Sequence, residues 1–551
     1  MKPCLSMALT TNSPEGGCAL LAAEALSHIP KLLMLQDRSP TSPTFGCFDR
    51  GYWHMRTSDF PCGITQTFLL PLALAYSLPI PGSPYYQQAE LRRWAIAGVR
   101  FAARSAHADG SCDDYYPFER ASGAAAFSLF ACLEAAEMFG LWDDAEIVPF
   151  LKKRARWLAG HEESGRLSNH EALIIACLAR LAEKFGGEWH GLMEARAKRL
   201  MGWQSSEGWF DEYGGMDPGY LTLTIAMLTD ADRRFPALGL KEPVRAAIRF
   251  LAHCIAPDGS LGGEWTSRAT VNFFPHGLEM AGAWEPLALQ IADVGYRRFA
   301  AQAQPCHADD RIGGHHVWSQ LLAWREWHAA RPEPLAFGDC LHDFAEAKVR
   351  VQQCGALRLI CGWSRGGAFR LFDGERLLRA DTGPSLRLTD GRVVIANLDG
   401  AEVVERSADR LVIEAPLAYA KSALLTPAKS IVLRAIMLTA GRFFPDLVRR
   451  ALQKLLVTGR KDAPFQFRRS LAWEDGALVV EDHLRADNGW DSVAEIGQSG
   501  FQVGLTTVMA RVWEPAQFQE WRDLTERLAS LAPNEPLVVR QVLRRQDLAN
   551  S

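Results

Sequence analysis

Residues 207–220, with the sequence EGWFDEYGGMDPGY, hold the pattern on which the predicted fold rests. An acidic residue and a glycine end one helical segment, and Asp217-Pro218 then supplies an N-cap and a first helical position for the next. A polar residue followed by glycine recurs along the first half of the chain, at Gly110, Gly165, Gly208, Gly259 and, more loosely, Gly313. Successive glycines lie 55, 43, 51 and 54 residues apart, a length that suits two helices and two loops.

Helical hairpins of this length stack as a solenoid or close into a toroid, and their turns then gather at one end. Apolar residues at helical spacing predict helices over residues 66–76, 90–106, 124–139, 170–185, 192–202, 220–228, 243–255 and 284–303. Polar and aromatic residues follow four of the turns, and loops on a rigid scaffold commonly carry function. We therefore expect a functional rim, with simple helix termination by acidic-glycine pairs as the alternative.

The pattern changes near residue 335, and we interpret the segment RPEPLAFGD at 331–339, which spans this point, as a linker. Short β-prone runs separated by Asp-Gly turns predict strands at 347–351, 356–362, 368–372, 392–395, 410–414, 430–438 and 477–482. Residues 442–457 have the pattern of an inserted helix, and 515–545 are helix-like in part. We expect an all-helical domain over 1–334 and an antiparallel β-rich domain over 335–551.

The composition of the 551 residues excludes several classes of protein. Hydrophobic residues make up 48% and charged residues 23%, which excludes a disordered, collagen-like or coiled-coil chain. The net charge of -4 shows no basic excess, so we expect no nucleic-acid partner. A basic cluster from Arg434 to Lys461 is better explained as a solvated helix face, although it can also attract an anionic polymer. The 17 Trp suit sugar-binding sites and large cores alike.

The cysteines and the N-terminus indicate a reducing compartment. The 12 Cys are scattered without a CxxC pair, which is typical of reduced, buried thiols. The N-terminus lacks a continuous apolar segment and no run of 18 apolar residues follows, so we expect a cytoplasmic protein without a membrane span, or a periplasmic one if the N-terminus is misannotated. Phosphate-binding loops, GxSxG and HExxH are missing, so we predict no cofactor, and a structural divalent metal stays open.

The candidate catalytic residues follow two of the turns. Asn169 and His170 open a predicted helix; an Asn amide can bind an anion, and a neutral His can move a proton near pH 7. Tyr220 falls in the first turn of the helix that Asp217 caps, where the helix N-terminus is expected to lower the pKa of a phenol. Tyr213, in the glycine-bounded loop before it, is a second candidate. Helix capping by Asn169 and packing by the tyrosines are the simpler alternatives.

Candidates for substrate binding lie in the same rim loops. Arg268 can bind a carboxylate or sulfate through two hydrogen bonds, and His276 is either a binding residue or a satisfied core histidine. The aromatic and charged residues that could stack on sugars or hydrogen-bond to them are Trp53, His54, Tyr115, Tyr116, Glu119, Arg120, Trp209, Glu212 and Trp265. Carboxylates such as Asp113, Glu119 and Glu212 are alternatively the acid and base of a glycoside hydrolase.

The sequence resembles the heparinase II/III-like superfamily of polysaccharide lyases and uronyl C5-epimerases. The resemblance rests on the Asn169-His170 pair that opens a helix, on the segment 207–220, and on a helical domain that precedes a β-rich one. Its motif match is confined to roughly 168–220, while the domain order covers most of the chain. It implies an incomplete (α/α) toroid followed by a β-sandwich, with an anionic polysaccharide or oligosaccharide held between them.

The resemblance also implies a role for each residue. Asn169 would neutralise the uronate carboxylate, His170 would act beside it as a base or polariser, and Tyr220, with Tyr213 as the fallback, would be the catalytic tyrosine. A neutralised carboxylate stabilises the intermediate that forms when the C5 proton is removed, as an oxyanion hole does. A general acid then protonates the departing glycosidic oxygen, and the product of this β-elimination is an unsaturated sugar.

Two departures from the superfamily pattern leave other outcomes open. Many members carry a further catalytic His in the β domain, where this chain has only His342 and His483, neither in a matching motif. Many members are also exported. Reprotonation of the C5 carbanion from the opposite face would make the protein a C5-epimerase, and a glycoside hydrolase or a non-catalytic glycan-binding protein are alternatives from other classes. The sequence sets neither the sugar nor the oligomeric state.

Overall fold

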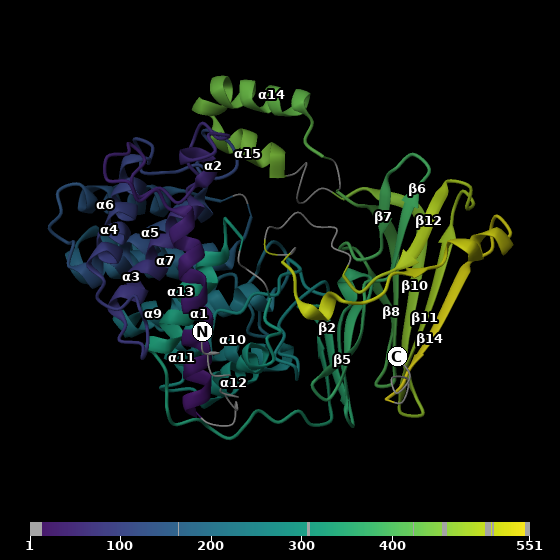
Figure 1. The fold of residues 1–551 in the computed structure, drawn as a ribbon. Helices are drawn as coiled ribbons and strands as arrows, with labels where there is room; N and C mark the ends of the chain where they lie inside the picture. Colours follow the sequence, from purple (N-terminus) through teal and green to yellow (C-terminus); the bar gives the residue numbers. More distant parts are fainter. Residues whose placement is uncertain are drawn as a thin grey trace, which may run out of the picture.

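The structure is a computed structural model that describes residues 14–163, 165–305, 309–421, 424–453, 460–501, 509 and 512–545. Helices occupy the chain as far as Arg325, and strands begin at Cys340 (Figure 1). The coarse prediction of a helical N-terminal part and an antiparallel β-rich C-terminal part is confirmed.

The helical part has one long N-terminal helix and a series of shorter ones. The helices are α1 (Pro14–Leu35), α2 (Arg50–Trp53), α3 (Leu69–Ser77), α4 (Ala89–Arg104), α5 (Ser122–Phe139), α6 (Ile147–Gly160), α7 (Ser168–Phe185), α8 (Glu188–Met201), α9 (Pro218–Arg234), α10 (Lys241–Cys254), α11 (His276–Ala281), α12 (Pro286–Ala300) and α13 (Gly313–Arg325). Two 3-10 segments, Ile64–Phe68 and Pro236–Leu238, lie between them. The sequence patterns did not predict α1, α2, α6, α11 and α13.

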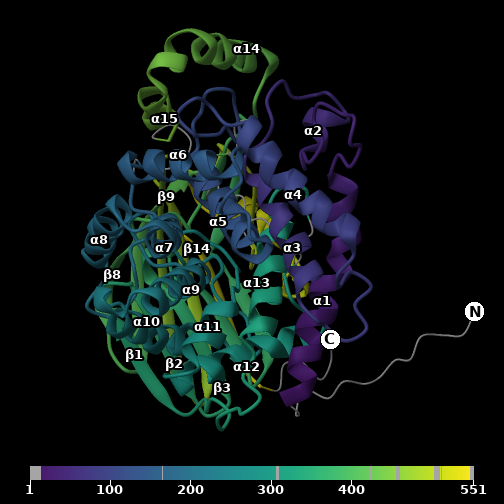
Figure 2. The same cartoon turned by 90° about the vertical axis from the view of Figure 1, so that its left-hand side faces the viewer.

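Six of these helices contact one another in a circuit. Each of α3, α5, α7, α9 and α11 contacts the next in this order, α11 contacts α13, and α13 contacts α3 (Figure 2). Helices α1, α4, α6, α8, α10 and α12 each pack against members of the circuit. Helix α5, SGAAAFSLFACLEAAEMF, is buried along almost all of its length because it has neighbours on both sides. Helix α10 buries only one apolar face.

The repeated glycine turns have a packing explanation. Gly110, Gly208 and Gly259 have φ values of 92°, 106° and 85°, which favour glycine. A Cβ atom on these residues would lie 2.6, 2.4 and 2.4 Å from the backbone of α6, α10 and α12, respectively. Each turn therefore lies directly against a later helix. Gly313 departs from this pattern because it is the first residue of α13.

The β-rich part consists of two antiparallel sheets. Strands β1 (Cys340–Phe344), β2 (Val349–Cys354), β3 (Leu357–Gly362), β4 (Ala368–Asp373) and β5 (Arg376–Asp381) form a five-stranded sheet in sequence order. The nine-stranded sheet contains β6 (Pro384–Leu388), β7 (Val393–Ile395), β8 (Glu402–Arg406), β9 (Arg410–Tyr419), β10 (Asp462–Glu474), β11 (Ala477–Ala486), β12 (Val493–Gln498), β13 (Arg522–Asp523) and β14 (Leu537–Leu543). Its order is β13-β12-β6-β7-β9-β10-β11-β14, with β8 paired to β9.

Alternation along β3 explains how the layers are arranged. Leu357, Leu359 and Cys361 pack in one buried cluster with side chains of β9, β10 and β11 in the larger sheet. Ile360, which points to the opposite face, belongs to the apolar core that the helices form. The smaller sheet is therefore the middle layer between the helices and the larger sheet (Figure 1).

An insertion between β9 and β10 corrects one strand prediction. Residues 430–438 are not a strand: α14 (Pro427–Ile436) continues into a π-helical turn, Met437–Gly441. Thr426 accepts a hydrogen bond from the Lys429 N–H, and Pro427 is at the first helical position. These helix-start signals outweigh the strand preference of the β-branched residues in this segment. The helix predicted over 442–457 corresponds to α15 (Pro445–Gln453), and residues 454–457 lie outside the described part. We call residues 424–453 the arm.

The C-terminal segment also differs from its prediction. Residues 515–545 contain two short 3-10 segments, Pro515–Gln517 and Thr525–Ser530, and the strands β13 and β14, but no α-helix among those described. The ten cysteines that the structure describes are all free thiols. In the same part of the chain, no group of three or more His, Cys, Asp and Glu is placed to hold a metal ion.

Two described helices are long and apolar enough to cross a membrane by length and composition. They are residues Gly16–Leu35 of α1 and Ser122–Phe139, which is α5. Helix α5 belongs to the circuit, and 78% of it is buried, as in the core helix of a globular protein. Helix α1 packs along α13 and buries residues such as Leu21, Ala25 and Ile29.

Candidate active site

The first turn of α7 and the loop before α9 lie side by side, although they are more than 40 residues apart in sequence. Leu167 and Glu212 form an isolated antiparallel bridge. The Tyr213 N–H donates a 2.7 Å hydrogen bond to the Arg166 carbonyl. The two segments that carried the candidate catalytic residues are thus joined at the N-terminal ends of α7 and α9.

The buried carboxylate of Glu212 holds this junction together. It accepts hydrogen bonds from Ser168 Oγ at 2.9 Å, from Asn169 Nδ2 at 2.9 Å and from the Asn169 backbone N–H at 3.3 Å. Burial raises the pKa of Glu212, while the charges of Arg268 and His170 oppose that rise. Glu212 therefore takes the capping position at the start of α7 that the sequence pattern suggested for Ser168 or Asn169.

Asn169 is almost completely enclosed. Its side chain is 1% exposed, its amide donates to Glu212, and its Oδ1 atom has no partner among the described residues. A direct contact between Asn169 and a substrate would depend on the second amide hydrogen. The structure thus gives Asn169 a positioning role toward Glu212.

His170 is held by a carboxylate that the sequence analysis did not identify. The Nδ1 atom of His170 lies 2.9 Å from Glu163 Oε2, so Nδ1 donates when the ring is neutral and Nε2 can accept a proton. Burial lowers the pKa of His170, but the charge and hydrogen bond of Glu163, with the charge of Glu212, outweigh it and raise the pKa overall. The ring packs edge-to-face on Phe127 and directly over Gly123 of α5.

Tyr220 lies in the first turn of α9, on a helix start that is tightly fixed. Asp217 caps α9 by accepting the Tyr220 N–H at 3.0 Å, and it also accepts hydrogen bonds from the hydroxyls of Thr266 and Thr270. The prediction that the helix N-terminus lowers the phenol pKa is wrong, because burial, together with the negative charge of Glu212, raises the pKa of Tyr220 despite Arg268. Tyr220 therefore keeps its proton at neutral pH.

Arg268 is the unpaired cation of this cluster. Its guanidinium lies over the Tyr213 ring, 4.3 Å from the centroid, and its Nε atom is buried without a partner. Arg268 forms no ion pair with the residues that the structure describes. Its charge influences the pKa of Glu212, His170 and Tyr220. A half-buried guanidinium with free donors can bind a carboxylate.

The loop that follows Gly110 is organised by its own carboxylates. Glu119 accepts the backbone N–H groups of Asp114 and Tyr115 at 3.0 and 2.6 Å, and burial beside Asp114 raises the pKa of Glu119 to about 8. Asp113 accepts the N–H groups of Phe118 and Arg120. With Glu212, these are the carboxylates of the hydrolase alternative, and each is occupied by hydrogen bonds within the protein.

The tyrosines of this loop lie closer to the cluster. Tyr115 is 56% exposed, and the Arg311 guanidinium lies 4.5 Å from the centre of its ring. Burial is the main cause that raises the pKa of Tyr115, and Tyr220 makes a smaller electrostatic contribution to that rise. Tyr116 is half-buried, and Arg120 pairs with Asp109 at 2.8 Å. Among the residues of this loop, Tyr115 is the one that best fits contact with a sugar.

His276 lies outside the cluster, which corrects its assignment as a binding residue. It is the first residue of α11, 2% exposed, with Nδ1 2.8 Å from Ser319 Oγ, and burial lowers its pKa to about 3. Asp230, the charged group with the largest effect on it, is ten residues along α9 from Tyr220, or about 15 Å. His276 is therefore a core residue.

Two of the rim tryptophans are also core residues. Trp209 is 8% exposed and donates its indole N–H to Glu207 at 3.0 Å. Trp265 is 3% exposed, and its backbone lies against Gly362 of β3, where a Cβ would approach the Trp265 carbonyl to 2.1 Å. Neither presents an open ring face to a sugar.

Trp53 and His54 lie at the end of the short helix α2. The Trp53 indole donates a 2.8 Å hydrogen bond to the Leu35 carbonyl, which fixes α2 to the end of α1. His54 is exposed, and its ring centre is 5.0 Å from that of Trp53. None of the described contacts joins these two residues to the Glu212 cluster.

Among the residues that the structure describes, the loop after β3 connects the β-rich part to the cluster. Arg365, which follows β3, donates a 2.8 Å hydrogen bond to the Ser267 carbonyl, and Ser267 Oγ donates to the Glu212 carbonyl at 3.0 Å. The sequence analysis missed Arg365, Glu163 and Gly123. The sequence offers no signal for Arg365 or Gly123, whereas Glu163 lies seven residues before His170 and could have been considered.

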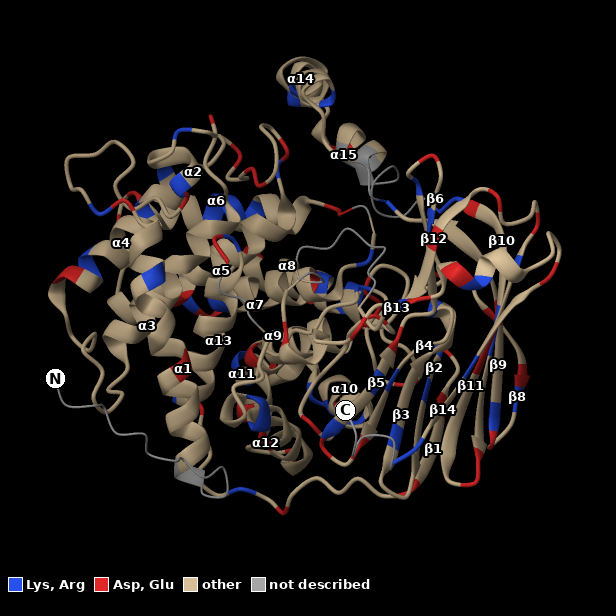
Figure 3. Cartoon of the chain, turned by 45° about the vertical axis from the view of Figure 1, so that its right-hand side comes forward, with Lys and Arg blue, Asp and Glu red and all other residues tan. Residues whose placement is uncertain are grey.

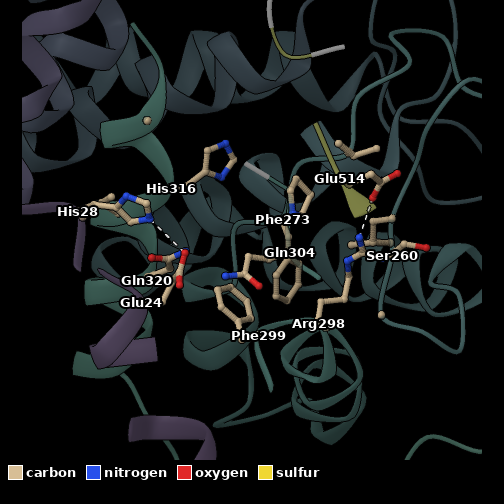
Figure 4. Close-up of a pocket in the computed structure, with 17 residues that line it drawn as sticks. Glu24, His28, Ser260, Phe273, Arg298, Phe299, Gln304, His316, Gln320 and Glu514 are labelled. Atoms are coloured by element: carbon tan, nitrogen blue, oxygen red, sulfur yellow. Dashed lines mark hydrogen bonds and ion pairs between the residues drawn. The ribbon is translucent and has the colours of Figure 1, made fainter. Parts of the chain in front are cut away.

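A small cavity lies elsewhere in the helical part. Its volume is about 40 Å³, and it is enclosed by α1, α12, α13 and the turn at Gly259. Figure 4 shows the His28–Glu24 pair on one side and the Arg298–Glu514 pair on the other, with Phe273 and Phe299 between them. It shares no lining residue with the Glu212 cluster, so we do not include it in the candidate site.

Comparison with solved structures identifies the class of fold. The fold, a helical circuit followed by layered antiparallel sheets, is similar to that of a Paenibacillus xanthan lyase, which matches with a TM-score of 0.51 at 12% identity, over 87% of this chain and 46% of that one. The Streptomyces coelicolor A3 chondroitin AC lyase in complex with chondroitin sulphate matches with a TM-score of 0.48 at 11% identity, over 87% of this chain and 67% of that one. A heparinase III matches with a TM-score of 0.40 at 11% identity, over 89% of this chain and 72% of that one.

At 12% identity, the likeness to the xanthan lyase concerns the fold alone. The chain spans less than half the length of the xanthan lyase. No family model matches the sequence. No curated protein matches it either.

Proposed function

We propose that the protein is a polysaccharide lyase that cleaves a uronate-containing anionic glycan by β-elimination. One observation carries the proposal: a guanidinium without an ion pair among the described residues, a histidine held by a carboxylate and a protonated tyrosine all interact electrostatically with Glu212, on a fold similar to that of a xanthan lyase. We interpret the helical circuit as the (α/α) toroid and the two sheets as the β-sandwich of that fold. The substrate would lie along the rim that carries Tyr115 and Tyr220.

The first requirement of the reaction is neutralisation of the uronate carboxylate. Arg268 meets it better than Asn169, because its guanidinium is half-exposed and unpaired whereas the Asn169 amide is enclosed and bound to Glu212. A bidentate guanidinium–carboxylate contact withdraws charge from the carboxylate and stabilises the enolate-like intermediate. The buried Glu212 would keep Asn169, and with it the start of α7, in a fixed position.

The second requirement is a base for the C5 proton. His170 suits this step because Glu163 holds the Nδ1 side of the ring, which leaves the Nε2 lone pair for the proton. The same carboxylate stabilises the imidazolium that forms. Phe127 and Gly123 fix the ring in one orientation.

The third requirement is an acid for the leaving group. Tyr220 retains its proton at neutral pH because burial raises its pKa, and it can donate that proton to the glycosidic oxygen as the C4–O bond breaks. The electron pair of the C5–H bond then forms the C4=C5 double bond. The proton of Tyr220 leaves with the new hydroxyl end, and exchange with solvent restores both groups.

A screen of anionic polysaccharides tests the proposal. The protein should produce ultraviolet-absorbing unsaturated ends from at least one uronate polymer. Deuterium from solvent that enters C5 without chain cleavage would identify a C5-epimerase instead. New reducing ends without unsaturation would identify a hydrolase and contradict the proposal.

A further inference from the structure

Exposed apolar side chains are concentrated in the arm. Of the nineteen large hydrophobic residues that are exposed in the described part of the chain, nine fall between residues 424 and 447. Leu424, Phe443 and Leu447 are 82%, 74% and 71% exposed. Among the arm residues whose burial the structure describes, only Met437 and Gly441 are buried, so these residues form no core of their own. An apolar patch of this kind marks a surface that another molecule covers.

The apolar face of α14 points away from the rest of the protein. Arg434 forms two hydrogen bonds with the Asp59 carboxylate, at 2.7 and 3.0 Å, so this side of α14 faces the helical part. Val432 and Ile436 are each two residues from Arg434 and therefore lie about 160° around the helix from it. Both are exposed. Figures 1 and 3 show α14 outside the body of the molecule.

The arm is also strongly basic. The sequence of the arm contains five Lys and Arg but a single acidic residue, Asp446, and four more Lys and Arg flank it between Lys421 and Lys461, whereas the whole chain carries a net charge of -4. Of the described residues, Lys429 and Arg442 are exposed. Basic residues beside an outward apolar helix face are typical of helices that lie in the interface of an anionic membrane.

We propose that the arm binds an anionic lipid surface, with α14 and α15 lying in the interfacial plane. Phe443 and Phe444, which are 74% and 65% exposed at the turn between the helices, would enter the acyl boundary. A soluble anionic polysaccharide complements the charge and can stack on an aromatic ring, but it does not match exposed aliphatic side chains such as Ile431, Val432 and Leu447. A lipid surface complements both features, so it is the occupant that the observations favour.

The position of the arm gives such binding a consequence for the candidate site. The Arg442 guanidinium lies 5.2 Å from the centre of the Phe118 ring, in the loop that also carries Tyr115. With the Arg434–Asp59 pair, this contact fixes the arm to the rim of the helical part. Binding through the arm would hold the candidate site close to the membrane surface, where a polymer attached to that surface is within reach.

Co-sedimentation of the full chain with lipid vesicles tests the proposal. Vesicles of phosphatidylcholine with about one third phosphatidylserine are compared with vesicles of pure phosphatidylcholine, at low and high salt. The variants are Phe443→Ser with Phe444→Ser, and Lys429→Glu. Phe518→Ser is the matched control, because Phe518 is 82% exposed and lies outside the arm. Thermal unfolding and analytical sedimentation without lipid check that each variant is folded and whether it self-associates.

We expect binding to the anionic vesicles, at least tenfold weaker binding to the neutral ones, and weakening by salt. The double Phe variant should reduce binding by tenfold or more and Lys429→Glu by a smaller factor, while Phe518→Ser binds as the wild type. Any one of three results overturns the proposal. These are no preference for anionic over neutral vesicles, binding of the double Phe variant that equals that of the wild type, and an arm-dependent dimer that does not bind vesicles. Each of these results is independent of lyase activity.

Discussion

The side-chain amide of Asn169 donates a 2.9 Å hydrogen bond to Glu212, which is 43 residues later in the chain. This contact joins the start of α7 to the loop before α9. It also occupies the Asn169 amide, which the resemblance to heparinase II/III-like lyases would direct at the substrate. The amide of Asn169 is therefore occupied by Glu212, and Arg268 is the residue that we propose to bind the carboxylate.

Replacement of Asn169 by Ala should cost stability as well as activity. The buried Glu212 would lose one donor, and an unsatisfied buried acceptor costs about 1–3 kcal/mol. Ser168→Ala removes the other side-chain donor to Glu212 and serves as the matched variant. Denaturant unfolding measures the loss. A full loss of activity in Asn169→Ala with unchanged stability would instead support direct contact with the substrate.

Glu163→Gln should move the pH profile to lower pH. Glu163 raises the pKa of His170, so its neutralisation lowers that pKa and lets the base be neutral in more acidic solution. The acidic limb of kcat/KM then shifts downward, and the His170 ring signals in NMR titrate at lower pH. The pKa of His170 is higher in the folded protein than in the unfolded chain. The His170–Glu163 pair therefore stabilises the fold fully below about pH 6.5, and this stabilisation is lost as the pH rises through the folded pKa of His170.

Glu162→Gln is the control for the pH experiment, because Glu162 is the preceding residue and pairs with Arg199 at 3.5 Å. It should leave the acidic limb where it is. If Glu162→Gln and Glu163→Gln give the same profile, Glu163 has no specific effect on His170.

Gly123→Ala should lower activity without unfolding the protein. The new Cβ would lie 2.5 Å from His170 Cε1, so the ring must shift, and a misplacement of about 1 Å can cost about 100-fold in rate. Gly191→Ala, in α8, is the control because nothing lies within 4 Å of its Cβ, and it should stabilise the helix by about 1 kcal/mol. Equal kcat for the two variants would mean that the position of His170 does not matter.

Arg268→Lys should lower kcat/KM for a uronate polymer, through kcat as well as KM, because the proposed contact both binds the carboxylate and stabilises the intermediate. Lysine keeps the charge but loses the planar donors, and a hydrogen bond to a charged group contributes about 1.5–3 kcal/mol, or about 10- to 100-fold in kcat/KM. Arg166→Lys is the control, because Arg166 is exposed and pairs with Asp211. On a polymer whose carboxyl groups are esterified, Arg268→Lys and the wild type should have the same kcat/KM. If the variant is still slower on the esterified polymer, Arg268 does not bind the carboxylate.

The sequence predicted the features that repeat and missed those that depend on distant neighbours. The glycine turns at Gly110, Gly208 and Gly259 were visible because each must lie against a later helix without a Cβ. Helix α6 was not predicted, and the strand predicted over 430–438 proved to be α14, because β-branched residues such as Ile431 and Val432 were weighed more than the Thr426 cap.

The candidate site was predicted in part for the same reason. His170, Tyr220 and Arg268 could be identified from local patterns, since each follows a glycine turn. His276, Trp209 and Trp265 have the same local patterns, but the structure buries them, and no sequence pattern reports burial by distant segments. The pKa of Tyr220 was also predicted in the wrong direction, because burial outweighs the helix N-terminus.

The most direct test of the account is the rate at which wild-type protein and Tyr220→Phe form unsaturated ends from the same uronate polymer, followed by ultraviolet absorbance. The account predicts product from the wild type and a fall of about 10²- to 10⁴-fold in the variant, the usual contribution of a general acid, with unchanged thermal unfolding. An unchanged rate in Tyr220→Phe, or cleavage that gives reducing ends without unsaturation, would contradict it.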